Sequence, residues 1–316
     1  MPSQNLGQAR VISPVNTQLA IGLQQNESVG QYLFPRIGVD MRSGKIITFG
    51  REHFMQYAGM QRSPGAATPR VKFGYAGSDY QLKDFSIEGT LPVEVQQEQR
   101  ATSKGFTIDG ARMAMTGAMT VVNNRLEIAQ AALATDLSNY PAANKVTLTS
   151  GSQFNDSGGD PIAVAVAARS AIRAATGKDV NTAVFSAKAM EATLENPKVL
   201  ARLNYTGVNV AGIEDLRRIL RIPNIYVGGG ITSADDGVTI SDIWGKDVVF
   251  AYTETASLAS MGLPTYGVTY QLNGYPFAEP AYYDNNHKTW YFPVTSCENP
   301  VITSNVAGYL VKNAVA

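Results

Sequence analysis

Three consecutive glycines, Gly228, Gly229 and Gly230, follow a predicted strand and are the first place to look for a phosphate-binding loop. A P-loop needs a Lys-Ser/Thr pair after its glycines, and none follows here. A dinucleotide-binding fingerprint needs a glycine where Ser233 stands. The glycine run is therefore predicted to form a turn. An α/β enzyme that binds a nucleotide at this turn stays the alternative from a different class of protein.

The two histidines, His53 and His287, lack the spacing of a metal site. Neither belongs to an i, i+4 pair, and neither has a cysteine or glutamate at ligand spacing. His287 follows Asp284 and is predicted to lie on a hydrated hairpin tip. The single cysteine, Cys297, cannot form an internal disulfide and is predicted to be a small buried side chain. We predict no catalytic, cofactor-binding or metal-binding residue, and the protein is not expected to be an enzyme.

An excess of basic residues lies between residues 45 and 106, where aromatic side chains alternate with polar ones as in a strand core. These residues form either a solvated strand face or a surface that pairs with carboxylates on an adjacent subunit. DNA binding by interleaved basic and aromatic side chains is less favoured. The candidates for contact with another subunit are Arg51, Arg62, Arg70, Lys72, Phe73, Lys83 and Phe85.

The same part of the chain has the period of two that is typical of strands. Strands are predicted at 45–49, 70–75, 80–87 and 91–95. The segment 59–69 is rich in glycine and proline and predicts the tip of a long hairpin. Long irregular loops of this kind usually bind a partner.

The clearest helix comes next, where apolar residues repeat at three and four positions between residues 115 and 137. It is predicted to span 109–139, with Thr107 or Asp109 as its cap and Pro141 beyond its end. A helix of this length extends ~45 Å.

Helices and strands alternate from residue 151 to about 262 and predict a mixed α/β lobe. Asp160 and Pro161 are a strong helix start, and that helix is predicted to end at Gly177. Ser186 caps a second helix that reaches Glu195. Short strands are predicted at 183–185, 225–227 and 248–252, with a further helix at 213–220.

The two ends of the chain differ from this lobe. Residues 1–44 are rich in Gln, Asn and Ser and predict an extended arm, which gains order by lying on a neighbour. Near the other end, strands at 281–283 and 289–292 flank a polar turn at 284–288.

The composition favours an assembly over a dispersed monomer. Only 16% of the 316 residues are charged, against roughly 25% in ordinary soluble domains. The 26 basic residues balance the 26 acidic ones, so there is no overall attraction to nucleic acid. The N-terminal residues have no pattern of a signal peptide, and no apolar run is long enough to span a membrane. The protein is expected to be made in the cytoplasm.

This order of elements resembles the major capsid proteins of tailed bacteriophages, whose fold is named after phage Hong Kong 97. Short sequence segments are similar too. YQLKDFSIEG at 80–89 resembles the returning strand of the family's extended loop, and TAVFSAKAM at 182–190 resembles the strand followed by a helix in the family's axial domain. IWGKDVVFAY at 243–252, followed by GLPTYG at 262–267, resembles the run back into the peripheral domain.

The resemblance implies an α+β protein of four parts. Residues 1–44 would be the N-terminal arm and 45–106 the extended loop. The peripheral domain would comprise 107–150, with a long spine helix, and be completed by 265–316. Residues 151–264 would form the axial domain.

The resemblance also implies a function. Copies of the chain would form hexamers and pentamers of an icosahedral shell that encloses phage double-stranded DNA in the virion. A separate scaffolding protein and a portal protein are implied as partners, and a decoration protein is left open. Synthesis would take place in the cytoplasm of the bacterial host. Some relatives cross-link a loop lysine to a neighbour's asparagine, but no local motif at Lys72 or Lys83 supports that reaction here.

Two further alternatives stay open. An encapsulin-like compartment would have the same fold and enclose cargo protein. A tail or decoration protein would be β-rich and would lack so long a helix.

Overall fold

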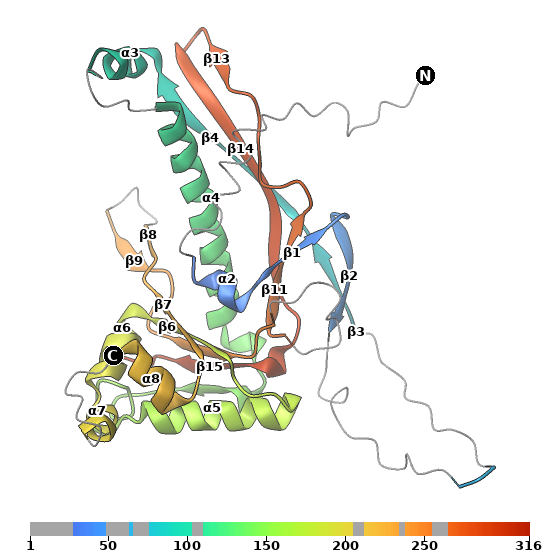
Figure 1. Ribbon diagram of the computed structural model, residues 1–316, viewed down its shortest axis with the longest axis vertical. Helices are drawn as coiled ribbons and strands as arrows, with labels where there is room; N and C mark the ends of the chain where they lie inside the picture. The colour runs from blue at the N-terminus through green and yellow to red at the C-terminus, as the bar shows by residue number, and fades with distance from the viewer. Residues whose placement is uncertain are drawn as a thin grey trace.

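The computed structural model of the protein describes residues 28–48, 63–65, 76–102, 110–204, 212–233, 238–254 and 265–316. Among these residues, one long helix, α4 (Gly110–Thr135), runs along a six-stranded sheet, and a five-stranded sheet lies near the C-terminal end of the helix (Figure 1). This mixture of helices and sheets is consistent with an α+β protein.

The six-stranded sheet is centred on β14 (Thr289–Ile302), a strand of 14 residues. Its antiparallel neighbours are β4 (Lys83–Pro92), β11 (Gly267–Leu272), β12 (Phe277–Ala278) and β13 (Tyr282–Asp284). The strand β1 (Arg36–Val39) extends the sheet by pairing parallel to β11. The predicted turn at 284–288 is confirmed, because β13 ends and β14 begins on either side of it.

The five-stranded sheet belongs to the predicted α/β lobe. Its order is β5 (Lys145–Thr147), β15 (Gly308–Lys312), β10 (Val248–Ala251), β6 (Thr182–Ser186) and β7 (Asn224–Gly228). The helices that pack on it are α5 (Pro161–Thr176), α6 (Ala187–Glu195), α7 (Pro197–Asn204) and α8 (Ile213–Leu220). One face of the sheet contributes Ala183, Phe185 and Phe250 to the core beneath these helices.

The last strand of the chain, β15, lies inside this second sheet. The predicted peripheral ranges include β5 and β15, but both strands are hydrogen-bonded into the sheet of the α/β lobe. The predicted boundaries at residues 151 and 264 stay a prediction. Strands from outside these boundaries, β5 and β15, pair in the same sheet as β10, which lies between them.

The predicted helix starts in the lobe are confirmed. The side chain of Asp160 accepts a hydrogen bond of 2.9 Å from the backbone N–H of Ala163, and Gly177 ends α5 with a left-handed φ of 72°. Ser186 accepts a bond of 3.3 Å from the N–H of Ala189 at the start of α6.

Helix α7 was not among the predicted elements, although it begins at Pro197. Proline is also favoured in the first turn of a helix. Here Asn196 receives the N–H of Lys198 at 3.0 Å and so starts a second helix directly after the first.

The long helix is shorter than predicted. It ends at Thr135 instead of residue 139, since Asp136 accepts the N–H of Ser138 at 2.8 Å and starts a 3-10 turn. The 26 residues of α4 extend ~39 Å. The side chains of Met115, Met119, Val122 and Leu126 are buried against β14 and β4.

The base of the predicted hairpin is present as β2 (Ser43–Thr48) paired with β3 (Ala76–Gln81). The predicted strand 80–87 is divided at Leu82 between β3, which pairs with β2, and β4, which pairs with β14. The Leu82 side chain is buried in the cluster that contains Val268. Most of the predicted tip at 59–69 and the predicted strand 70–75 lie outside the described residues.

The strand predicted at 91–95 is present only at Leu91 and Pro92 and is wrong from Val93 onward. β4 stops at Pro92, and residues from Val93 form the helix α3 (Val93–Thr102), whose Gln and Glu residues are good helix formers. The N–H of Val93 donates to the carbonyl of Lys288 at 3.0 Å, so the helix starts where β4 leaves the sheet.

The described end of the predicted arm is part of the core. Helix α2 (Gly30–Leu33) and the residue after it bury Leu33 and Phe34 completely. Gly267 permits this contact, because a Cβ there would lie 2.4 Å from the Phe34 ring. Residues 28–39 are therefore anchored between α4 and β11, unlike the extended arm that was predicted.

Candidate functional site

The residues predicted to contact another subunit are only partly placed. Lys83 and Phe85 belong to β4. The others lie outside the described residues and stay predictions: Arg51, Arg62, Arg70, Lys72 and Phe73.

Lys83 is exposed at the start of β4, opposite Glu298 in the sheet register. The next residue, Asp84, forms an ion pair with Arg42, which also donates to the hydroxyl of Tyr275 at 3.3 Å. Lys83 thus presents a positive charge at the edge of a fixed strand.

Phe85 is half-buried and has a partner within its own chain. The guanidinium carbon of Arg125, on α4, lies 2.8 Å from the centroid of the Phe85 ring. A cation over an aromatic face is attracted by the ring quadrupole. The contact holds the loop strand β4 on the helix.

A buried charge cluster lies beside this contact. Glu298 is 1% exposed, and its Oε2 is 3.6 Å from Nε of Arg36. Burial raises the pKa of Glu298, although Arg36 and Arg125 oppose that shift. Burial also lowers the pKa of Arg36. The cluster therefore joins β1, β14 and α4 by charges that are removed from water.

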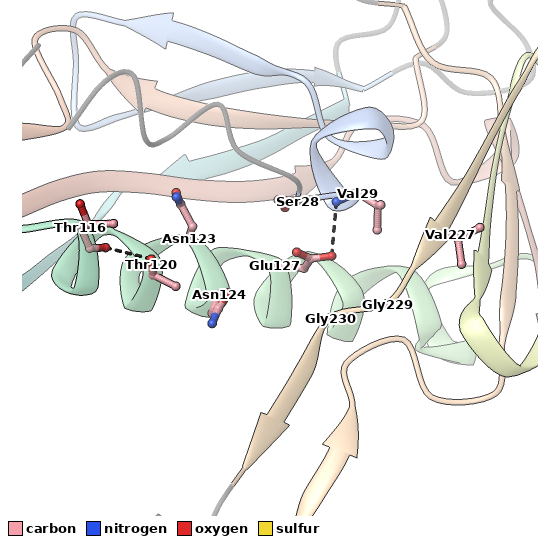
Figure 2. Close-up of a pocket in the computed structure, with 10 residues that line it drawn as sticks. All are labelled: Ser28, Val29, Thr116, Thr120, Asn123, Asn124, Glu127, Val227, Gly229 and Gly230. Atoms are coloured by element: carbon pink, nitrogen blue, oxygen red, sulfur yellow. Dashed lines mark hydrogen bonds between the residues drawn. The ribbon is translucent and has the colours of Figure 1, made fainter. Parts of the chain in front are cut away.

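A pocket of about 480 Å³ lies between α4, the residues before α2 and the turn after β7 (Figure 2). Its lining is mostly polar. The residues are Ser28, Val29, Thr116, Thr120, Asn123, Asn124, Glu127, Val227, Gly229 and Gly230.

Glu127 is the central group of this pocket. Its buried Oε1 accepts a hydrogen bond of 2.9 Å from the indole N–H of Trp244. The same oxygen accepts one of 3.4 Å from the backbone N–H of Val29 (Figure 2). One carboxylate oxygen thus joins the helix, the end of the arm and the α/β lobe.

One turn further along α4, Gln130 makes a second connection. Its side-chain N–H donates to the hydroxyl of Thr269 at 2.9 Å, and that hydroxyl donates to the carbonyl of Phe34 at 3.0 Å. The polar residues of α4 therefore fasten the arm end between the two sheets.

The chemistry of the pocket is that of a joint between elements. The hydroxyls of Thr116 and Thr120 donate at 2.8 Å to helix carbonyls one turn earlier, which occupies their protons. The Glu127 carboxylate already accepts two bonds. Neither threonine therefore presents a free hydroxyl to the Glu127 carboxylate.

The glycine run is a turn, as predicted. Gly228 ends β7, and the next two glycines lead to β8 (Ile231–Ser233). A Cβ on Gly228 would lie 2.3 Å from the Trp244 ring, so glycine allows the indole to pack here and to reach Glu127.

The other chemical candidates are also placed. Cys297 is fully buried, as predicted, and burial raises the pKa of its thiol to about 12. His287 lies on the exposed turn between β13 and β14, with Nδ1 at 2.5 Å from Asp284. His53 lies outside the described residues.

Two features are absent from the residues that the structure describes. No group of three or more His, Cys, Asp or Glu side chains among them is arranged to hold a metal ion. Within the same ranges, no helix has both the length and the apolar character that crossing a membrane requires.

The sequence alone did not reveal the connections that Glu127 and Gln130 make. The helical repeat around Glu127 gave no sign of its partner, because Trp244 is 117 positions away in the sequence. One signal could have indicated the role of Glu127. The helix has few charged residues, so a carboxylate within it requires an explanation.

The fold defines the class of protein. A virus-like particle from Pyrococcus furiosus matches with a TM-score of 0.54 at 10% identity, covering 94% of this chain and 98% of that one. A chain of the satellite phage P4 procapsid matches with a TM-score of 0.53 at 9% identity, covering 94% and 90%. The chain therefore has the Hong Kong 97-like fold of shell-forming capsid proteins.

Closer relatives specify the family. A phage-related protein from Bordetella bronchiseptica is 32% identical with a TM-score of 0.81, covering 97% of this chain and 98% of that one. The major capsid protein of Burkholderia phage BcepMu is 30% identical over 310 residues, 97% of each chain. This chain belongs to that family of phage major capsid proteins, and it is a shell-forming component of the virion. No family model matches the chain.

Proposed function

We propose that copies of this chain assemble as hexamers and pentamers into an icosahedral head that encloses phage double-stranded DNA. The observation that carries the proposal is the 30% identity to a phage major capsid protein along 97% of both chains. An encapsulin-like compartment for cargo protein is disfavoured by the same relative, because it is a phage protein.

The proposed division of labour follows the predicted parts. Residues 1–44 act as the arm, whose described end at 28–39 is anchored in the core. Residues 45–106 act as extended loop, 107–150 with 265–316 as peripheral domain, and 151–264 as axial domain. The paired β2 and β3 support an extended loop, because they form a separate two-stranded sheet at its base.

The loop contacts a neighbouring subunit through its basic residues. Lys83 supports this proposal because it is exposed and begins β4, a strand of the proposed loop that is fixed in the sheet. Phe85 acts through Arg125 of its own chain and positions the loop.

The chain acts without catalysis or cofactor, as a structural protein. Its further partners are a separate scaffolding protein, a portal protein and the packaged DNA, which it contacts weakly since its net charge is zero. It is made in the cytoplasm of the bacterial host and enters the virion from there.

The test is negative-stain electron microscopy of the purified full chain, with sedimentation velocity on the same sample. We expect closed shells, tubes or ring-shaped capsomers. A homogeneous monomer that resists assembly in salt, crowding agent and a scaffold-containing lysate of phage-infected cells would contradict the proposal.

The role of the loop is tested by Lys83→Glu, with Lys178→Glu in the α/β lobe as the matched exposed lysine. We expect Lys83→Glu to lower the yield of particles severalfold and to leave the unfolding temperature of the free subunit unchanged. Equal particle yields for the two variants would remove Lys83 from the proposed contact.

A further inference from the structure

One face of α4 carries apolar side chains that remain exposed. Met113, Val121 and Ile128 are 62%, 51% and 39% exposed. Spacings of eight and seven residues keep them within about 80° of one another around the helix, on one face. Gly117 and Asn124 lie between them on the same face, and a Cβ on Gly117 would meet open space. We call these five residues the helix seam.

The helix seam is separate from the face that holds α4 in its own chain. That face packs on β14 and β4 through buried side chains such as Met119 and Leu126. The pocket face, with Thr116, Thr120 and Glu127, lies next to the helix seam and shares Asn124 with it. An apolar line along a solvated helix is the arrangement by which helices receive a partner.

A second exposed apolar surface is the ribbon of β8 with β9 (Ile240–Asp242). Ile231 and Ile240 are 56% and 64% exposed. Ile231 pairs with Asp242 and Ser233 pairs with Ile240, so the two isoleucines lie on the same face. The other face carries Thr232 and Ser241.

A surface hairpin that needs no partner does not expose two large apolar side chains on one face, as this ribbon does. In the described part of the chain its strands pair only with each other. An isolated two-stranded ribbon is marginally stable in water and needs a surface to pack on. Figure 2 shows the ribbon leaving the body at Gly230 and pointing away from α4.

We propose that the β8–β9 ribbon of one copy packs with its isoleucine face on the helix seam of an adjacent copy. The inference rests on the proposed function and specifies one contact within it. The occupant is a second copy because members of this family form shells from copies of themselves. Ribbon and seam are different surfaces of one chain, so their contact is heterologous and repeats around a ring. The open space at Gly117 accepts a side chain from the ribbon.

Single-cysteine variants test the contact directly. Val121→Cys and Ile240→Cys are prepared as separate full-length proteins, one with a mass tag, mixed before assembly and oxidised after it. Because each chain carries only one added thiol, a disulfide between tagged and untagged chains reports contact between copies. The native Cys297 is fully buried, and the unsubstituted protein serves as the control for its reactivity.

We expect disulfides that join Val121→Cys to Ile240→Cys chains in at least half of the assembled material. Assembled particles that give only Val121→Cys homodimers would indicate that two seams face each other and would overturn the proposal. Particles without any disulfide would also overturn it and would leave the seam to another protein.

Charge substitutions provide an independent measurement. Val121→Glu and Ile240→Glu are each expected to lower particle yield at least tenfold, with circular dichroism of the free subunit unchanged. Val166→Glu, at a position on α5 that is 57% exposed, is the matched control and should assemble normally. If all three variants form particles as the unsubstituted chain does, the contact is wrong and the shell function stands. If the unsubstituted chain forms none, the proposed function and this contact fall together.

Discussion

Glu127 and Trp244 are 117 positions apart in the sequence, and the carboxylate of one accepts the indole N–H of the other at 2.9 Å. Both side chains are buried. Trp244 also packs in the cluster that contains Leu33 and Phe34, from the arm end, and Tyr266. The bond therefore fixes the angle at which α4 enters the α/β lobe.

Removing this acceptor should destabilise the subunit. Glu127→Ala leaves the N–H groups of Trp244 and Val29 without their partner, and a buried unsatisfied donor costs about 1–3 kcal/mol. Chemical denaturation of the free subunit measures the loss. Asn124→Ala, an exposed position on the same helix, is the control and should stay within about 0.5 kcal/mol.

A double-mutant cycle with Trp244→Phe isolates the pair. The coupling between Glu127→Ala and Trp244→Phe is expected to be about 1 kcal/mol or more, because the two groups touch. Additive effects would mean that the bond does not contribute to stability.

The buried carboxylate of Glu298 should make stability depend on pH. Burial raises its pKa above the ordinary value of 4.5, so the folded subunit binds this proton more tightly than the unfolded chain does. Its contribution is therefore greatest below about pH 4.5 and is lost as the pH rises through the higher folded-state pKa.

The measurement compares the unsubstituted subunit with Glu298→Gln across that range. The stability of the former relative to the latter should fall as the pH rises. Glu94→Gln, on the exposed side of α3, separates this effect from the simple loss of one negative charge. If the stability of the unsubstituted subunit instead rises relative to that of Glu298→Gln as the pH rises, the assignment is contradicted.

The cap at Asp160 should contribute locally to the α/β lobe. Asp160→Ala removes the bond to Ala163 and the ion pair with Lys198 at 3.3 Å, and losing an N-cap costs about 1 kcal/mol. Asp160→Asn keeps an acceptor oxygen and should cost less. Thermal unfolding at neutral pH distinguishes the three proteins.

The pH dependence at this cap has the opposite sign to that of Glu298. Burial acts to raise the pKa of Asp160, but the N–H of Ala163 and the charge of Lys198 lower it below 3.8. The stabilisation is thus present above about pH 3.8 and is lost as the pH falls through the lower folded-state pKa. Asp160→Asn should lack that acid-sensitive part, and an unchanged acid profile would refute the cap's role.

The contact of Arg125 with Phe85 should be visible in the free subunit. We expect a coupling of about 1 kcal/mol between Arg125→Met and Phe85→Leu in denaturation experiments, since the guanidinium lies over the ring. If Phe85→Leu lowers particle yield without affecting the free subunit, then Phe85 contacts a neighbour as first predicted.

Features that depend on neighbours in sequence were predictable. Asp160 and Ser186 cap helices because their side chains reach N–H groups three residues away, and the repeat of apolar residues identified α4. The same local reasoning failed where two local rules compete. Pro197 both ends α6 and begins α7, and the segment after Pro92 has apolar residues at alternate positions but folds as α3.

The sequence by itself determined the long helix, the capped helices of the α/β lobe and the buried state of Cys297, because caps, periodicity and hydrophobicity act over a few residues. The class of fold followed from the resemblance of the element order to a known family. Only the tertiary structure decided that β15 joins the sheet of the α/β lobe, that Trp244 reaches Glu127, and that Arg125 covers Phe85. Those relationships join residues far apart in the chain, and they depend on which strands pair and in which register. No local preference encodes that pairing, since it is selected by burial of all the elements together.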